Sequence, residues 1–398
     1  MRYARALMMT VLAIGAVACK DKEPQKDAPP TAETKVSAAP TSDTIVIGHV
    51  GSLTGNEATF GQSTENAINL AVEEQNAKNG IKGKKIAFKS YDDQGKPEEA
   101  AVAATRLVTQ DKVLVYLGEV ASSRSIAMAP IADSNKIPMI SNASTNPKVT
   151  KDGDKTRPYV FRVCFIDPFQ GTVMAKFAAE NKKFKKVAIL RDVGNDYSVG
   201  LANFFTETFK KLGGEIVDDV SYKAGDQDFK AQLTKLKGKN ADALYVPGYY
   251  TDVALLARQA RELGIKLPLM GGDGWDSPKL FEIAKGALDG SYFSNHYSPE
   301  DASPVVQEFI GKYKAKYNAV PDALAVLGYD AAKVAFDAID RAKELTGPAV
   351  RDAIEQTKGF KGVSGNITLD ADHNATKSAV VIGIEKNAQK YAATINPS

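Results

Sequence analysis

From Thr44 onward the chain alternates short apolar runs with segments of helical periodicity, and this alternation limits its fold more than any other feature. Apolar runs of four to eight residues predict buried strands, and the segments between them place their apolar residues on one helical face. Strands are expected at 44–50, 85–91, 113–117, 137–140, 187–190, 215–222, 243–247 and 268–271. Repeated strand–helix units of this length predict an α/β fold with parallel sheets covered by helices on both faces. The pattern runs twice, which indicates two similar lobes.

After Tyr297 the pattern changes. Residues 304–317, 329–342 and 348–356 are expected to be mostly helical, and 365–369 with 378–384 are expected to form a closing pair of strands.

The composition fits a soluble globular chain of two domains. Its 398 residues are 43% hydrophobic and 25% charged, and the net charge is only +3. The basic residues are scattered rather than gathered in a stripe, so we expect no nucleic-acid partner.

The N-terminus carries the features of an export signal. Arg2 and Arg5 precede an apolar segment at 6–18, which is too short to span a bilayer and typical of a signal-peptide core. It ends in small residues before Cys19, a pattern that resembles the processing site of bacterial lipoproteins. We therefore expect a signal peptide at 1–18 and a lipid on Cys19. The alternative is ordinary cleavage that leaves Cys19 as a free thiol.

The segment that follows Cys19 has almost nothing to bury. Residues 19–42 are rich in Pro, Lys, Asp, Glu, Ala and Thr, which predicts a disordered tether between a membrane anchor and the folded part. The chain has one further cysteine, Cys164, in a strand-like run, and this thiol is expected to be buried and inert.

Two turns rich in small hydroxyl residues follow strand-like runs of the first lobe. One spans 118–123 and contains Ser122, and the other spans 140–145 and contains Ala143, Ser144 and Thr145. Such turns leave backbone N–H groups open and suit a carboxylate, although they also serve as plain helix caps. In open α/β sheets ligands bind at the carboxyl ends of strands, which is where both turns lie.

The second lobe offers the opposite chemistry at its strand ends. Asp273 follows one strand, and Tyr197, Tyr249 and the single Trp275 lie in the turns around it. A carboxylate beside aromatic faces suits a cationic amine, although an Asp between glycines is also typical of an Asx turn. An acid-binding turn that faces an amine-binding turn predicts an amino acid as ligand.

The sequence lacks the motifs of the main enzyme classes. It has no phosphate-binding loop, no G-x-G-x-x-G after a strand, no H-E-x-x-H and no G-x-S-x-G, and its three histidines are isolated. The pair Asp92 and Asp93 is interpreted as a solvated or hinge-side turn before Pro97 rather than as metal ligands. We therefore expect no catalysis, no metal and no cofactor, and a glycosyltransferase on a two-lobed scaffold is disfavoured.

From Thr44 to Tyr391 the chain resembles the leucine/isoleucine/valine-binding proteins of bacterial ABC transporters. The matching segments are 51–55 (GSLTG), 76–83 (NAKNGIKG), 91–93 (YDD), 121–123 (ASS), 245–249 (YVPGY), 257–261 (ARQAR) and 271–274 (GGDG). The resemblance implies the type I periplasmic binding fold, in which two Rossmann-like lobes with parallel sheets are joined by a three-strand hinge. It places lobe 1 at 43–162 plus 295–362 and lobe 2 at 163–294 plus 363–395, with hinge crossings near Arg162, Asn295 and Gly362.

The resemblance also implies roles for single residues. Ser122 and Thr145, with the backbone of Ala143, would hold the ligand carboxylate, and Asp273 would hold the α-amino group where Glu is common in the family. Tyr197 and Tyr249 would close over the ligand. The expected pocket for the ligand side chain is lined by Phe60, Val120 and Trp275.

The resulting hypothesis is an extracytoplasmic solute-binding lipoprotein, periplasmic or on the cell surface and monomeric. It would bind a branched-chain or other aliphatic amino acid by hinge closure and deliver it to the permease of an ABC transporter. The alternative is a sensor subunit of the same fold that binds another small carboxylate or an amide.

Overall fold

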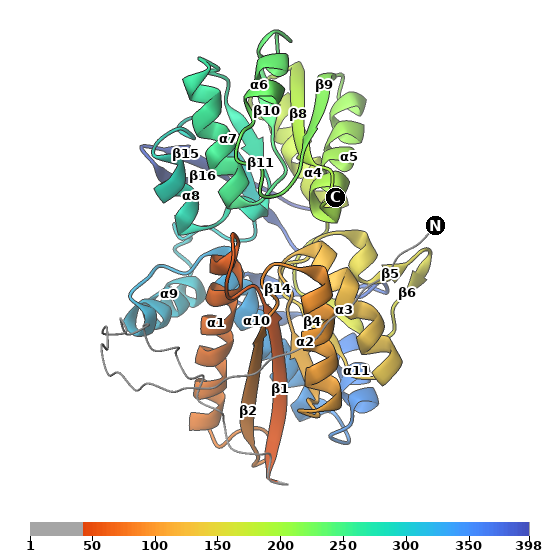
Figure 1. Cartoon of the computed structure of the whole chain (residues 1–398). Helices are drawn as coiled ribbons and strands as arrows, with labels where there is room; N and C mark the ends of the chain where they lie inside the picture. The colour runs from red at the N-terminus through yellow and green to blue at the C-terminus, as the bar shows by residue number, and fades with distance from the viewer. Residues whose placement is uncertain (1–42, 398) are drawn as a thin grey trace, which may run out of the picture. The chain divides into compact units, whose positions relative to one another are not determined.

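The computed structural model describes residues 43–397. The signal peptide, the lipid on Cys19 and the tether, all predicted for residues 1–42, lie outside the described residues. The remainder forms two lobes that are each built around one large sheet (Figure 1). The expected α/β fold with two lobes of parallel strands is confirmed.

Lobe 1 is built on a five-stranded parallel sheet with the order β2-β1-β3-β4-β7. Its strands are β1 (Thr44–Gly51), β2 (Lys85–Asp92), β3 (Val115–Leu117), β4 (Met139–Ser141) and β7 (Val160–Arg162). Successive side chains of a strand point to opposite faces. Ile45 and Ile47 of β1 accordingly join one apolar cluster, whereas Val46 and Val50 join another on the other face. This is why β1 is apolar along nearly its whole length.

Helices cover both faces of this sheet. They are α1 (Ala58–Ala77), α2 (Pro97–Thr109), α3 (Ser122–Asn135), α9 (Pro304–Tyr317), α10 (Ala323–Arg341) and α11 (Gly347–Glu355). Helix α1 packs on α10, and α2 packs on α3. The lobe also holds the 3₁₀ turn η1 (Pro147–Val149), the hairpin β5 (Lys151–Asp152) with β6 (Lys155–Thr156), and the hairpin β13 (Phe360–Gly362) with β14 (Gly365–Ile367).

Lobe 2 is built on a seven-stranded mixed sheet with the order β16-β15-β12-β11-β10-β8-β9. The strands are β8 (Lys186–Asp192), β9 (Glu215–Tyr222), β10 (Ala243–Tyr245), β11 (Leu269–Gly271), β12 (Tyr292–Asn295), β15 (Ala379–Glu385) and β16 (Ala388–Ile395). Five of them, from β12 to β9 in this order, are parallel, and β15 and β16 add an antiparallel edge. The helical elements are α4 (Asp167–Lys176) with the π-helical turn η2 (Phe177–Asn181), α5 (Asp196–Lys211), α6 (Lys230–Lys237), α7 (Tyr250–Glu262), η3 (Asp273–Trp275) and α8 (Pro278–Ala284).

The chain passes between the lobes at residues 163–166, 296–303 and 376–378. The third crossing differs from the expected one near Gly362. Asp330 of α10 accepts hydrogen bonds from the backbone N–H groups of Val363 (2.7 Å) and Ser364 (2.9 Å), and the carbonyl of His373 accepts one from Arg162 N. These bonds keep residues 363–375 on lobe 1.

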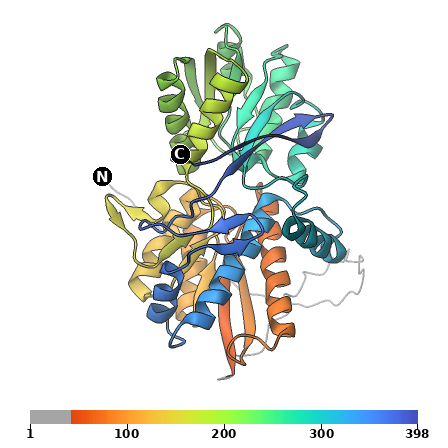
Figure 2. The same cartoon turned by 180° about the vertical axis from the view of Figure 1, so that it is seen from behind.

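The expected closing pair of strands is also wrong. Strand β15 pairs with β16 rather than with β14, because a tight turn after Glu385 returns the chain along β15 (Figure 2). Strand β14 pairs instead with β13.

Candidate functional site: a cavity between the lobes

A small cavity of about 10 Å³ lies between the lobes. Each lobe contributes half of its lining, and most of these residues follow the carboxyl end of a strand or begin a helix. From lobe 1 come Phe60, Val120, Ala143 and Leu324, and from lobe 2 come Tyr197, Tyr249, Asp273 and Gly274. This volume is far below the 300–1,000 Å³ typical of pockets for drug-sized molecules and is close to that needed by one water molecule, so the two lobes are packed closely around the cavity in this structure.

The lobe 1 side of the cavity offers unpaired donors. Ser122 opens α3, and no side chain caps this helix, because its N-cap position is occupied by Ala121. The backbone N–H groups at such a helix start favour an anion. Next to it, Thr145 is 1% exposed and its hydroxyl makes no hydrogen bond within residues 43–397. The Ser122 hydroxyl accepts from Asn146 N at 3.2 Å, which joins the two turns.

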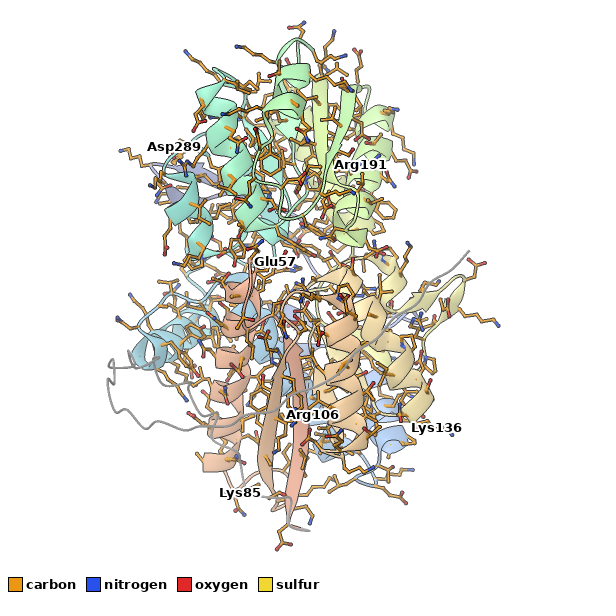
Figure 3. All side chains as sticks on the ribbon, in the orientation of Figure 1. Glu57, Lys85, Arg106, Lys136, Arg191 and Asp289 are labelled. Atoms are coloured by element: carbon orange, nitrogen blue, oxygen red, sulfur yellow. The ribbon has the colours of Figure 1, made fainter. Side chains whose placement is uncertain are left out.

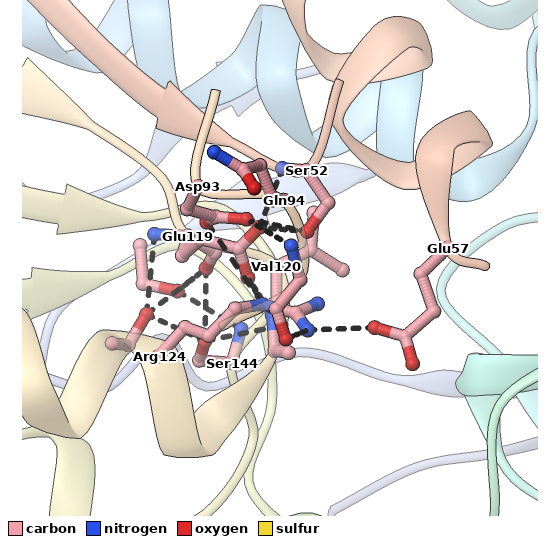
Figure 4. Close-up of polar contacts among 12 residues, drawn as sticks. Ser52, Glu57, Asp93, Gln94, Glu119, Val120, Arg124 and Ser144 are labelled. Carbon is pink, nitrogen blue, oxygen red and sulfur yellow. Dashed lines mark hydrogen bonds and ion pairs between the residues drawn. The ribbon is translucent and has the colours of Figure 1, made fainter. Parts of the chain in front are cut away.

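The side chain of Ser144 points in a different direction from those of its neighbours. Its hydroxyl donates to the carbonyl of Glu119 at 2.8 Å and lies 2.7 Å from the Ser125 hydroxyl. The side chain therefore points into the turn and not into the cavity (Figure 4). Ser144 braces the two turns against each other, which is a supporting role rather than a ligand contact.

A buried ionic network holds these turns from below (Figure 4). Arg124 donates through Nε to Glu119 at 2.8 Å and through Nη1 to Glu57 at 2.6 Å. Glu119 also accepts from the backbone N–H of Ser52 at 3.1 Å. Asp93 accepts from the Ser52 hydroxyl at 2.8 Å, and burial together with the charge of Glu119 raises the pKa of Asp93 to about 8. The network joins the turns that follow β1, β2 and β3 into one unit.

The lobe 2 side carries two buried carboxyl groups. Asp273 Oδ1 accepts from Gln170 Nε2 at 2.8 Å, and Asp273 Oδ2 lies 2.9 Å from His296 Nε2. The His296 ring stacks on Phe165 with a centroid distance of 3.8 Å, which fixes its orientation. Burial lowers the pKa of His296, so the neutral ring donates from Nε2 to the carboxylate.

Asp167, at the start of α4, is the second of these carboxyl groups. It lies beside the Thr145 hydroxyl, and neither group makes a hydrogen bond of ordinary geometry within the described part of the chain. Burial raises the pKa of Asp167 well above its usual range. Two unsatisfied oxygens of a fully buried carboxyl group are costly and call for a donor.

Aromatic rings close the remaining side of the cavity. Tyr197 stacks on Tyr249 with centroids 5.3 Å apart, and Phe60 meets Tyr249 edge-on at the same distance. The Tyr197 hydroxyl accepts from Gly274 N at 3.2 Å, whereas the Tyr249 hydroxyl is buried without a partner in the described structure. Phe60 belongs to lobe 1, so the rings meet across the boundary between the lobes.

Trp275 does not line the cavity, in contrast to the expectation. Its indole N–H donates to the carbonyl of Val246 at 3.0 Å, and its ring packs against Phe293 in the core of lobe 2. The ring also fills the space above Gly271, where an added Cβ would come within 2.1 Å of it.

Five residues of the site were missed by the sequence reasoning. They are Asp167, Gln170, Gly274, His296 and Leu324. Asp167 and Gln170 are three residues apart at the start of a helix and share one face, a signal that was present but not used. The sequence gives no reason to connect His296 with Asp273, because only the fold brings the two residues together.

Asp92 and Asp93 lie at the end of β2 as turn residues. Asp92 accepts from the backbone N–H groups of Leu53 (2.9 Å) and Thr54 (3.2 Å), which stabilises the turn after β1. Within residues 43–397 no group of three or more His, Cys, Asp or Glu side chains is arranged to hold a metal ion. In the same range no helix is both long and apolar enough to cross a membrane.

A larger groove of about 1110 Å³ lies beside two of the crossing segments. Its wall includes Tyr391 and Lys377, and it shares His296 with the site. The groove is open, and its charged groups are engaged locally: Glu300 pairs with Lys390 at 2.9 Å, and Lys377 donates to the Ser364 hydroxyl. The cavity between the lobes is the better candidate, because its buried polar atoms lack partners.

Comparison with known proteins gives a consistent result. Residues 44–389 match the model of the family described as periplasmic binding protein. A Leu/Ile/Val-binding protein homologue from Brucella melitensis is 33% identical over 327 residues, which is 81% of this chain and 86% of that protein.

Solved structures agree in fold along nearly the whole described chain. The leucine-binding protein LivK from Thermotoga maritima has a TM-score of 0.85 and 44% identity, covering 89% of this chain and 99% of its own. The substrate-binding protein LivJ from Streptococcus pneumoniae, solved with isoleucine, has a TM-score of 0.84 and 36% identity over 89% of this chain and all of its own.

Proposed function

Because the chain belongs to the periplasmic binding protein family, whose members bind solutes and are not enzymes, we propose that it binds a branched-chain amino acid for an ABC transporter. The names of its relatives, Leu/Ile/Val-binding and leucine-binding proteins, support this ligand class. The proposed task is to capture the amino acid outside the cytoplasm and to release it to a permease.

The observation that carries the proposal is the distribution of unsatisfied polar atoms around an otherwise apolar cavity. On the lobe 1 side stand the open N–H groups of α3 and the free hydroxyl of Thr145. On the lobe 2 side stand the unpaired carboxyl group of Asp167 and, in the lining of the cavity, the carboxylate of Asp273, which already accepts from Gln170 and contacts His296. A molecule with a carboxylate at one end and an ammonium nearby meets both requirements.

In this proposal the ammonium group takes its place between the two aspartates and the Thr145 hydroxyl. Asp273 has its ordinary partners Gln170 and His296, yet a carboxylate accepts about four hydrogen bonds, so it retains capacity for one more. Asp167 has both oxygens unpaired. An ammonium, with three donors, would convert the costly burial of Asp167 into a charge-assisted hydrogen bond.

The walls of the cavity favour an aliphatic side chain. Phe60, Val120 and Leu324 present no polar group, so a ligand hydroxyl or amide placed against them would lose its hydrogen bonds to water. Apolar pockets discriminate poorly between side chains that differ by one methylene, so leucine, isoleucine and valine are all expected to bind.

The anchor is a separate part of the proposal. Lipid on Cys19 would keep the protein at a membrane near the permease. Replacement of Cys19 by Ser is expected to release the protein into the soluble fraction of cells. Continued partition of this variant with membranes would remove the anchor from the proposal.

The ligand is tested by thermal unfolding of the wild-type protein with matched compounds. L-leucine is compared with 4-methylpentanoate, which lacks the amine, and with isoamylamine, which lacks the carboxylate. At a hundredfold excess over Kd a ligand stabilises the folded protein by about 2.7 kcal/mol, and only L-leucine and its branched-chain relatives are expected to do so. Equal stabilisation by 4-methylpentanoate would show that the two aspartates do not recognise an ammonium group, and the proposed ligand class would fail.

A further inference from the structure

The two lobes also touch outside the cavity, and one residue carries an unusual share of that contact. Asp196 is the first residue of α5 in lobe 2. Its carboxylate accepts from the Ser123 hydroxyl at 3.1 Å, and its backbone N–H lies 3.0 Å from the same hydroxyl. Its carbonyl accepts from Asn146 Nδ2 at 2.8 Å, and the second carboxylate oxygen meets Lys148 Nζ at 3.0 Å. Every polar group of Asp196 therefore meets lobe 1.

These contacts are neighbours in sequence of the residues that face the proposed ligand. Ser123 follows Ser122, Asn146 follows Thr145, and Asp196 precedes Tyr197. Figure 1 shows α3 below and α5 above the boundary between the lobes, both in the right half of the view. In each of the three turns, one residue faces the proposed ligand and its neighbour in sequence contacts the opposite lobe.

This arrangement couples closure of the two lobes to the geometry of the proposed ligand site. Asn146 N donates to the Ser122 hydroxyl, so the lobe 1 half of the contact is tied to the proposed carboxylate site. On the lobe 2 side, Asn195 caps α5 by accepting from Tyr197 N at 3.0 Å, which fixes the first turn that carries both Asp196 and Tyr197. When Asp196 meets Ser123, Tyr197 is brought over the cavity.

We propose that Asp196, with Ser123 and Asn146, forms a latch that sets the balance between open and closed lobes without touching the ligand. The proposal rests on the proposed function, because a latch matters only if the lobes close on a solute. Asn146 is buried and Ser123 half-buried, so their hydrogen bonds are worth more than the exposed ion pair with Lys148. Asp196 is a positioning residue in this scheme.

A latch of this kind has a distinctive signature. The apparent Kd equals the intrinsic Kd divided by the fraction of molecules competent to bind. Weakening the latch lowers that fraction for every ligand alike. Asp196→Ala is therefore expected to raise the Kd for L-leucine, L-isoleucine and L-valine by one common factor of about ten. The change is expected in the dissociation rate, because the closed state is what retains the ligand.

The experiment measures Kd and dissociation rate for the three amino acids by calorimetry and stopped-flow fluorescence. Glu207→Ala is the matched control, since Glu207 is an acid on the same helix whose ion pair with Lys211 stays within lobe 2. The control is expected to leave all three Kd values unchanged. The thermal midpoints of the ligand-free variants should agree, which separates a latch from a loss of stability.

A double substitution tests the pairing itself. Ser123→Ala removes the same contact from the other side, so Asp196→Ala with Ser123→Ala is expected to bind no more weakly than the weaker single variant. Fully additive losses would overturn the pairing. An unchanged Kd in Asp196→Ala, or a loss confined to one amino acid, would overturn the latch. Failure of the wild-type protein to bind any of the three would instead reject the proposed function.

Discussion

The two lobes support their halves of the cavity in different ways. In lobe 1 the turns after β1, β2 and β3 are joined by the buried network of Glu119, Arg124 and Asp93, all within that lobe. In lobe 2 Asp273 is held by Gln170, which follows the first crossing segment, and by His296, which lies in the second. Figure 3 shows Glu57, the outer end of the lobe 1 network, at the boundary between the lobes.

The difference suggests an order of events. The carboxylate half is assembled inside one rigid lobe and is expected to be complete before closure. The amine half depends on residues at the hinge, so its geometry is expected to change with the angle between the lobes. Each prediction below tests one side of this comparison, from the largest expected effect to the smallest.

The largest effect is expected in the lobe 1 network. Arg124→Met leaves Glu119 buried without its cation, and breaking a buried pair in this way costs about 3–5 kcal/mol. The free energy of unfolding without ligand, measured by urea titration and circular dichroism, should fall by that amount. Arg191→Met is the control, because the Arg191–Asp219 pair is more exposed (23% and 35%) and should contribute under about 1 kcal/mol. Equal losses in both variants would mean that the network does not stiffen lobe 1.

The second largest effect is expected for Asp273 in lobe 2. Asp273→Ala removes a buried charge that we propose pairs with the ligand ammonium, a change that costs about 2–5 kcal/mol in comparable pairs. Calorimetry with L-leucine is expected to show at least a thirtyfold rise in Kd, about 2 kcal/mol. The fold should persist by circular dichroism. Asp289→Ala, on the surface of the same lobe, should leave Kd unchanged, and unchanged affinity in Asp273→Ala would remove this residue from the site.

The fold could be predicted from the sequence, because the signals for its buried strands are local. Strands β1 and β3 are buried on both faces, so their apolar runs stand out between helices. The third crossing was not readable in this way. Residues 363–375 remain on lobe 1 because Asp330 and Arg162 bind their backbone, and Asp330 lies more than thirty positions away in sequence.

The residues of the candidate site also divide into those with a local sequence signal and those placed only by long-range contacts. The composition of the turn at 140–145 identifies it as a candidate site; Ala143 of this turn lines the cavity, and Thr145 has a buried hydroxyl without a partner in the described structure. Trp275 was chosen for its ring chemistry, yet the bare Cα of Gly271 leaves a space in lobe 2 that the ring fills. His296 carries no local signal, because its role comes from the stacking on Phe165 and the bond to Asp273. Residues that act through long-range contacts cannot be found from spacing alone.

A smaller effect is expected for the hinge support of lobe 2. His296→Leu removes the donor that orients Asp273, and a hydrogen bond to a charged group is worth about 1.5–3 kcal/mol. The Kd for L-leucine is expected to rise about tenfold or more. His373→Leu is a close control, since His373 also stacks on a phenylalanine (Phe161, 4.1 Å) but lies on lobe 1 away from the cavity. Equal effects of the two substitutions would indicate a general disturbance of the hinge rather than support of Asp273.

The smallest effect is a dependence of binding on pH. Burial raises the pKa of Asp252 in α7 to about 7, and the charges of Glu57, Asp192 and Asp226 add to the rise, whereas the bond from Gly225 N opposes it. Glu57 belongs to lobe 1, so opening the lobes removes its charge and returns the pKa of Asp252 toward the ordinary value. The closed state then holds the proton more tightly than the open state, and a fall in pH through 7 favours closure.

The affinity for L-leucine is therefore expected to rise a few-fold between pH 8 and pH 6. Asp252→Asn should bind with the higher affinity throughout and should lose this dependence. If the affinity of Asp252→Asn for L-leucine depends on pH as strongly as that of the wild-type protein, the interaction between Glu57 and Asp252 is not the source of the pH dependence. The lobes would then meet at that edge without an electrostatic cost, and the asymmetry between them would be confined to the cavity itself.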